Sequence, residues 1–150
     1  MPKAHVIKNF GGPEVLEWGE VEVADPGPGE VRLRQRAVGM NMMEVGLRMG
    51  VYPGPPLPFI PGVEAAAEVI ALGEDVADFK VGDRVGYAGP PVGSYAEERN
   101  FPESRLFSLP DDVTDVVAAA SMVKGITAEC LMRLTYKEGP QSRELIHAAA

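Results

Sequence analysis

The chain has 150 residues, a length typical of one domain, and a hydrophobic fraction of 45% that is sufficient for a buried core. Its formal net charge of −8 argues against nucleic acid and anionic membrane surfaces as partners. The 17 glycines and 14 prolines divide the chain into short segments, which argues against a helical bundle and favours short strands. A single cysteine excludes an internal disulfide and thiolate-rich metal sites, which fits a cytoplasmic location, and no apolar run is long enough to cross a membrane.

The first third of the chain predicts strands separated by turns. Residues 4–10, 16–23 and 30–38 combine β-branched residues with alternation of apolar and polar positions, which is typical of half-buried strands. A short helix over 42–49 follows, with Asn41 as its N-cap. The five prolines of 52–62 then predict a stiff extended connection over the surface.

The second half predicts further strands and one long helix. Strands are expected at 62–72, 83–88, 93–99 and 105–109. An alanine-rich helix then begins at Thr114 or Asp115 and continues to about Leu134, and Gly125 within it indicates close packing or a bend. Residues 144–147 predict the start of one more strand.

Three segments carry a pattern that is specific in its order. Residues 73–85 read GEDVADFKVGDRV, the proline-rich segment 57–64 ends in a Gly-x-Glu strand start, and 109–128 holds the alanine-rich helix that reaches KGITA. In this order, and with GSYAE at 93–97, they resemble the medium-chain dehydrogenase/reductase superfamily and its zinc-free quinone oxidoreductase (zeta-crystallin-like) branch. The resemblance implies a mainly β fold with α: a GroES-like β-barrel catalytic body over 1–113, then a linking helix and the first strand of an incomplete Rossmann domain over 114–150.

The resemblance also implies that the zinc ions of related alcohol dehydrogenases are absent. Asn41 stands where those relatives have a cysteine ligand and Val63 where they have a histidine, and neither an amide nor an isopropyl group is a good zinc ligand. The short loop 89–93 replaces the lobe that carries their structural zinc. The chemistry that the resemblance implies is therefore hydride transfer from NADPH to an already electrophilic quinone or conjugated enone.

Four residues are the candidates for this chemistry. The resemblance implies that Asn41, Tyr52 and Thr127 lie beside nicotinamide and substrate with Lys124 close by, so that Asn41 and Tyr52 are catalytic candidates and Asn41, Lys124 and Thr127 bind the cofactor. Each has a plainer interpretation. Asn41 can simply cap a helix, Tyr52 can cover the proline-rich segment, Lys124 can be a solvated charge, and Thr127 can bond a carbonyl of its own helix.

Methionines gather around the predicted short helix, at Met40, Met42, Met43 and Met49. They predict either an adaptable apolar pocket for the acceptor or the filling of a core.

The activity of the chain by itself is a separate question. The family's pyrophosphate-binding glycine turn is not among the 150 residues, so we expect little or no reductase activity and weak NADPH binding from this chain alone. A second hypothesis is a non-catalytic module that binds a partner chain or self-associates through an exposed apolar helix.

Overall fold

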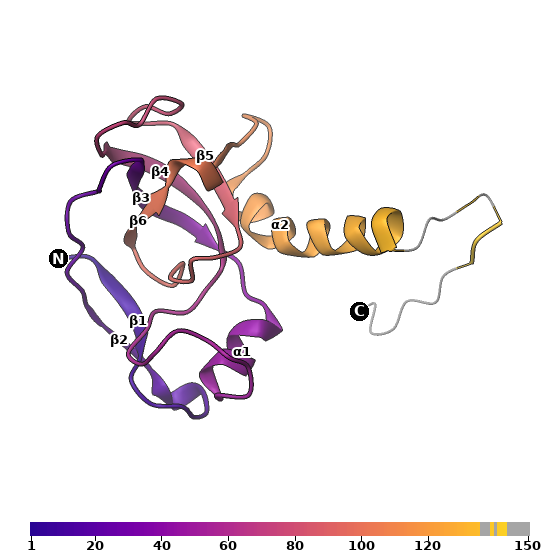
Figure 1. Cartoon of the computed structure of the whole chain (residues 1–150), viewed down its shortest axis with the longest axis horizontal. Helices are drawn as coiled ribbons and strands as arrows, with labels where there is room; N and C mark the ends of the chain where they lie inside the picture. Colours follow the sequence, from indigo (N-terminus) through magenta and orange to yellow (C-terminus); the bar gives the residue numbers. More distant parts are fainter. Residues whose placement is uncertain (136–138, 140, 144–150) are drawn as a thin grey trace.

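A strand-rich body and one long helix make up the described part of this computed structural model, residues 1–135, 139 and 141–143 (Figure 1). The strands of this part are β1 (Lys3–Ile7), β2 (Leu16–Glu20), β3 (Glu30–Val38), β4 (Glu64–Leu72), β5 (Arg84–Ala88), β6 (Glu98–Pro102) and β7 (Phe107–Ser108). The helices are α1 (Met42–Arg48) and α2 (Asp115–Glu129), followed by a π-helical turn, Cys130–Thr135, with short 3-10 turns at Pro13–Val15 and Glu103–Arg105.

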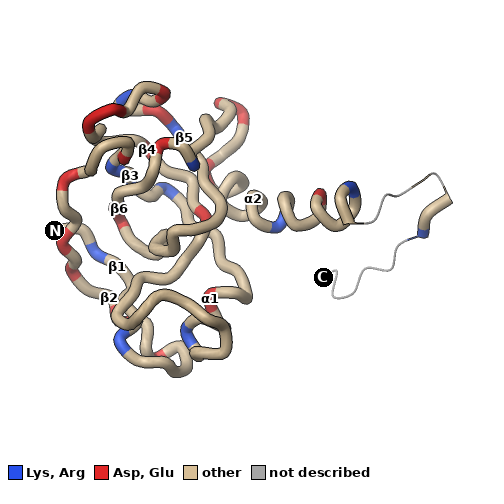
Figure 2. Tube along the Cα trace, viewed as in Figure 1, with Lys and Arg blue, Asp and Glu red and all other residues tan. Residues whose placement is uncertain are grey.

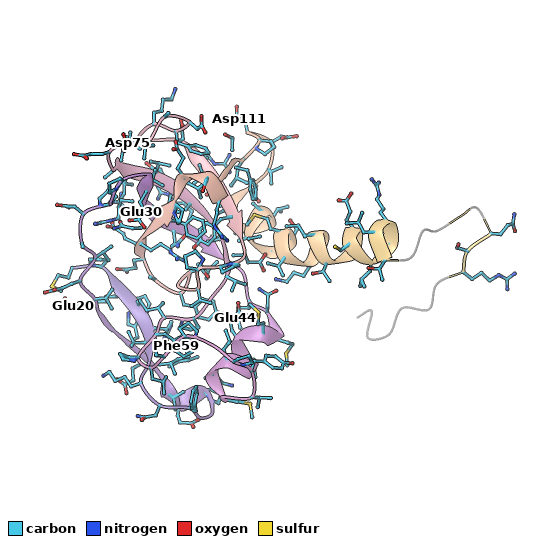
Figure 3. The ribbon with its side chains drawn as sticks, viewed as in Figure 1. Glu20, Glu30, Glu44, Phe59, Asp75 and Asp111 are labelled. Carbon is cyan, nitrogen blue, oxygen red and sulfur yellow. The ribbon has the colours of Figure 1, made fainter. Side chains whose placement is uncertain are left out.

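Two antiparallel sheets form the body. β1 pairs with β2, and the larger sheet has the strand order β6-β3-β4-β5-β7. Isolated bridges join Ala4 and Ile7 of β1 to Ala96, which precedes β6, and to Phe59 in the proline-rich segment. The proline-rich segment therefore reaches inward at Phe59, which is buried and lies in the lower part of the body in Figure 3, although the sequence predicted a surface connection.

The core lies against the larger sheet. Alternation along β3 buries Val31 and Leu33, as the sequence predicted, and they pack with Val85, Tyr87 and Phe101 from neighbouring strands. The rings of Tyr87 and Phe101 stack with their centroids 4.2 Å apart. Because β4 lies in the middle of the sheet, Ala65, Ala66 and Ala67 are buried and allow close approach of neighbouring elements.

Helix α2 is joined to the body through its first half. Thr114 is the N-cap, and its hydroxyl accepts a hydrogen bond from the Val117 amide. Ala118 and Ala119 are buried against Ala66 and Leu109, and these small residues let the helix approach the sheet closely. Beyond this contact α2 extends away from the body (Figure 1).

Four sequence expectations need correction or limitation. The strand expected at 93–99 begins only at Glu98, because the amides of Gly93, Ser94 and Tyr95 turn back to the carbonyls of Gly62 and Pro61. Gly125 is in open space, so no close packing explains it. The helical segment reaches Thr135, close to its expected end near Leu134, but it is α-helical only to Glu129 and continues as the π-helical turn Cys130–Thr135. The strand expected at 144–147 lies outside the described residues.

Charge and hydropathy of the described part agree with the composition. Figure 2 shows acidic and basic residues interspersed over the body. None of the helices in residues 1–135 combines the length and the apolar character that crossing a bilayer requires.

Candidate functional site

Asn41 lies at the junction of β3 and α1, where the chain changes from extended to helical structure. Its backbone is extended, and its backbone amide donates a 2.7 Å hydrogen bond to Glu44 Oε2 in the first turn of α1. A carboxylate there is favourable because the free amides of a helix start carry partial positive charge. Asn41 is therefore the N-cap residue of α1, as the sequence predicted, and Figure 3 shows Glu44 at this end of the helix.

The side chain of Asn41 is held by Glu64, the first residue of β4. Asn41 Nδ2 donates to Glu64 Oε1 at 2.9 Å. Glu64 is fully buried, and a buried carboxylate is costly unless cations and hydrogen-bond donors surround it. Sequence reasoning did not assign Glu64 a role, although the Gly-x-Glu motif at the end of 57–64 contained the signal.

Helix α2 supplies the remaining donors to Glu64. Lys124 Nζ lies 2.6 Å from Glu64 Oε1, and the backbone amide of Val123 donates to Glu64 Oε2 at 2.8 Å. The Lys124 side chain is 48% exposed, so its ammonium group pairs with a buried carboxylate and still faces solvent. The interpretation of Lys124 as a merely solvated charge does not describe this geometry.

The other two candidates stand apart from this cluster of Asn41, Glu64 and Lys124. Thr127 Oγ1 donates to the Val123 carbonyl in its own helix at 2.7 Å, which is its plainer interpretation. Tyr52 is 52% exposed, and its ring covers Gly46 of α1 so closely that a Cβ atom there would overlap it. Within residues 1–135 no hydrogen bond joins either side chain to the cluster.

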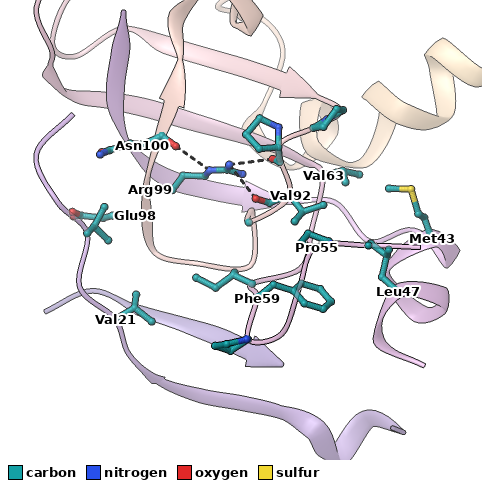
Figure 4. A pocket seen from close by; sticks show the side chains of 18 of the residues that line it. Val21, Met43, Leu47, Pro55, Phe59, Val63, Val92, Glu98, Arg99 and Asn100 are labelled. Carbon is teal, nitrogen blue, oxygen red and sulfur yellow. Dashed lines mark hydrogen bonds between the residues drawn. The ribbon is translucent and has the colours of Figure 1, made fainter. Parts of the chain in front are cut away.

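A cavity of about 960 Å³ opens beside the cluster, between the proline-rich segment and the loop before β6 (Figure 4). At one end it is lined by Met43, Leu47, Val63 and Val123, and the last two are direct sequence neighbours of Glu64 and Lys124. At the other end lies Arg99, whose guanidinium donates to the carbonyls of Pro91 and Val92. The end of the cavity next to the cluster therefore has apolar walls, whereas the far end carries a charged side chain.

None of the four candidate side chains, Asn41, Tyr52, Lys124 and Thr127, lines this cavity.

The two interpretations of the methionines have different outcomes. Met40, Met42, Met43 and Met49 are all exposed, so the interpretation as core filling is wrong. Met43 lines this cavity and Met40 lines a second one of about 470 Å³, so the pocket hypothesis applies at the larger cavity to Met43. Met42 remains on the surface because α1, with seven residues, buries only its opposite face, at Glu44, Gly46 and Leu47. Met40 and Met49 lie just outside this helix.

Two carboxylates give this region a negative field. Burial, first, and then the negative charges of Glu44 and Glu64 together raise the pKa of Tyr95 to about 12. Tyr95 therefore keeps its proton at neutral pH. In the core, burial also raises the pKa of Tyr87.

Asn41 and Val63, at the positions where the resemblance implies zinc ligands in related alcohol dehydrogenases, are poor ligands for that metal. Asn41 already donates its amide nitrogen to Glu64, and Val63 carries no lone pair. Within the described ranges, no group of three or more histidine, cysteine, aspartate or glutamate side chains is placed to hold a metal ion.

Comparison with known proteins decides the family. Residues 27–111 match the alcohol dehydrogenase GroES-like domain, which is more than half of the chain. The chain belongs to this family. The predicted fold class is thereby confirmed, with the catalytic-domain body preceding the linking helix α2.

The most similar relatives of this GroES-like chain include quinone oxidoreductases. It is 48% identical over its full length to a quinone oxidoreductase of Pseudomonas aeruginosa and 45% identical to a 2-haloacrylate reductase of a Burkholderia species. It covers 46% of each of these proteins and so spans about half the length of the curated relatives it matches. The identity to quinone oxidoreductases confirms the resemblance inferred from the sequence motifs.

Solved structures agree with these relatives. A quinone oxidoreductase of Pseudomonas syringae superimposes with a TM-score of 0.89 at 44% identity, covering 93% of this chain and 43% of that one. The Escherichia coli quinone oxidoreductase complexed with NADPH gives 0.87 at 38% identity, covering 90% of this chain and 41% of that one.

Proposed function

We propose that the chain is the N-terminal, acceptor-side part of an oxidoreductase that transfers hydride from NADPH to a quinone or conjugated enone without zinc. The observation that carries the proposal is the full-length identity of 48% to a quinone oxidoreductase, together with Asn41 and Val63 at positions that cannot hold zinc. The named substrate of the Burkholderia relative supports an activated alkene as a further acceptor class. We place the activity in the cytoplasm, where a single unpaired cysteine is stable.

Asn41 and Lys124 are the residues of this chain that fit a nicotinamide cofactor. When bound, NADPH supplies the hydride. Asn41 is fixed by Glu64 and Glu44 and so presents a rigid amide for hydrogen bonding to the cofactor. Lys124 has only one of its three N–H donors directed at Glu64 Oε1, which leaves ammonium donors for a cofactor or substrate oxygen. Thr127 remains a proposed contact one helical turn further along α2.

The acceptor is proposed to enter the apolar end of the cavity. A quinone ring there lies against Met43, Leu47 and Val63 and is shielded from water. Hydride transfer leaves negative charge on an acceptor oxygen, and nearby hydroxyl or ammonium donors stabilise that charge. Tyr52 and Lys124 are the proposed donors, and Tyr52 requires a change in its present position over Gly46 to reach the cavity.

A direct test uses the 150-residue chain and a fully substituted p-benzoquinone, which cannot add to cysteine. We expect saturable shifts of the backbone amides of Met43, Val63 and Val92 in proton–nitrogen correlation spectra, and no saturable shift of Asn41 or Val63 on addition of Zn²⁺. Quinone shifts confined to other surfaces, or tight zinc binding at Asn41, would overturn the proposal.

The exposed apolar side chains of α2 and of the π-helical turn that follows it, among them Ile126, Leu131 and Leu134, support a second candidate. This is a module that binds a partner chain or a second copy and performs no catalysis. Measurement of NADPH-dependent quinone turnover, with the 150 residues joined to the complementary part of a relative, separates the two candidates.

A further inference from the structure

We propose that Glu64 is a positioning residue that holds Asn41 and Lys124 in one fixed arrangement, and this inference rests on the proposed function. Glu64 is fully buried, whereas Lys124 is half exposed and Asn41 partly buried. Both neighbours donate to the same carboxylate oxygen, Oε1, at 2.9 Å and 2.6 Å. The buried Glu64 carboxylate therefore holds both of the more accessible side chains, Asn41 and Lys124.

The chemistry of a carboxylate makes this support directional. An ionised carboxylate only accepts hydrogen bonds, so it fixes the nitrogen end of the Asn41 amide toward β4. Turning the amide over would place its carbonyl oxygen against Glu64 Oε1, and the two acceptors would repel each other. The orientation of Asn41 toward a ligand is thus set by Glu64.

The second oxygen of Glu64 fixes the helix that carries Lys124. Glu64 Oε2 accepts from the backbone amide of Val123, in the interior of α2. Gly39 makes this approach feasible, because a Cβ atom there would overlap both the Glu64 carboxylate and the Ala119 carbonyl. The Glu64 side chain therefore sets the position of α2, of the Lys124 ammonium group on that helix, and of the Asn41 side-chain amide at the start of α1.

A glutamine substitution tests this role. Glu64→Gln preserves size but replaces one acceptor with a donor, so it cannot satisfy all three partners. The matched control is Glu68→Gln on the same strand, which removes a carboxylate that pairs with Arg36. Val85→Ala serves as a second control that removes packing from the buried core without touching the cluster.

The first measurement is hydrogen exchange of side-chain groups in the 150-residue chain. We expect the Asn41 side-chain amide to exchange more slowly than that of exposed Asn9, and Glu64→Gln to accelerate it by about tenfold or more while shifting the Lys124 ammonium signal. Glu68→Gln and Val85→Ala should leave both signals unchanged, even where Val85→Ala lowers the melting temperature.

The wild-type chain keeps the proposal falsifiable if Glu64→Gln does not fold. Exchange of the wild-type Asn41 side chain as fast as that of Asn9 would overturn the proposal. So would unchanged Asn41 exchange in a folded Glu64→Gln chain.

The second measurement separates positioning from the proposed function itself. The 150 residues are joined to the complementary C-terminal part of the Pseudomonas aeruginosa relative, and NADPH-dependent quinone reduction is measured. We expect Glu64→Gln to lower kcat by about tenfold or more, with Glu68→Gln close to wild type and Glu64→Asp between them. Wild-type kcat in Glu64→Gln would overturn positioning alone, whereas absent turnover in the folded wild-type joined protein would overturn the proposed function and leave the exchange result standing.

Discussion

The first part of helix α2 is packed against the body, whereas its end and the π-helical turn after it are exposed. In the first half Ala118 and Ala119 are 3% and 2% exposed, and Lys124 at its end pairs with Glu64. Beyond Lys124, Ile126 is 58% exposed and Leu134, in the π-helical turn, is 75% exposed. The comparison teaches that small side chains and one buried carboxylate, rather than large apolar side chains, decide which part of the helix belongs to the body.

The largest expected effect contrasts the core with the end of the helical segment. Leu33→Ala removes a side chain that is fully buried, and we expect it to lower the free energy of unfolding by about 2–5 kcal/mol. Leu134→Ala makes the same chemical change at an exposed position and should change it by less than about 0.5 kcal/mol. Denaturant titration measures both. Equal losses would show that the end of the helical segment is packed in solution.

Alanine substitutions at two glycines should change the free energy of unfolding by smaller amounts and in opposite directions. Gly39→Ala inserts a Cβ atom against Ala119 and Glu64, and we expect it to destabilise the chain by about 1–3 kcal/mol. Gly125→Ala meets no atom within 4 Å and should stabilise the helix by up to about 1 kcal/mol. Thermal unfolding of both variants checks the signs. A neutral Gly39→Ala would mean that α2 does not approach the sheet this closely.

Much of the fold followed from local sequence pattern. Alternation along β3 and the turn at 73–85 located strands, and Thr114 located the start of α2, because these signals depend on residues close in the chain. The position of β6 did not follow, since the turn of residues 93–95 depends on hydrogen bonds to Gly62 and Pro61.

The site was only partly predictable from the sequence, because its hydrogen bonds also join residues that are remote in the chain. Asn41 and Lys124 came from the family resemblance, and the structure brings them together on one carboxylate. Glu64 itself reads as an ordinary strand start, because its burial depends on donors from α1's entry and from α2, both remote in sequence. The roles of Tyr52 and Thr127 in binding or catalysis stay predictions.

The central claim is that this chain contributes the acceptor side of a zinc-free quinone reductase. The most direct measurement is quinone reduction by the joined protein after exhaustive treatment with a zinc chelator, with circular dichroism to establish that it is folded. We expect NADPH-dependent turnover that the chelator does not reduce, and little or none from the 150 residues alone. A folded joined protein without turnover, or with turnover that is lost to the chelator and restored by Zn²⁺, would contradict the claim.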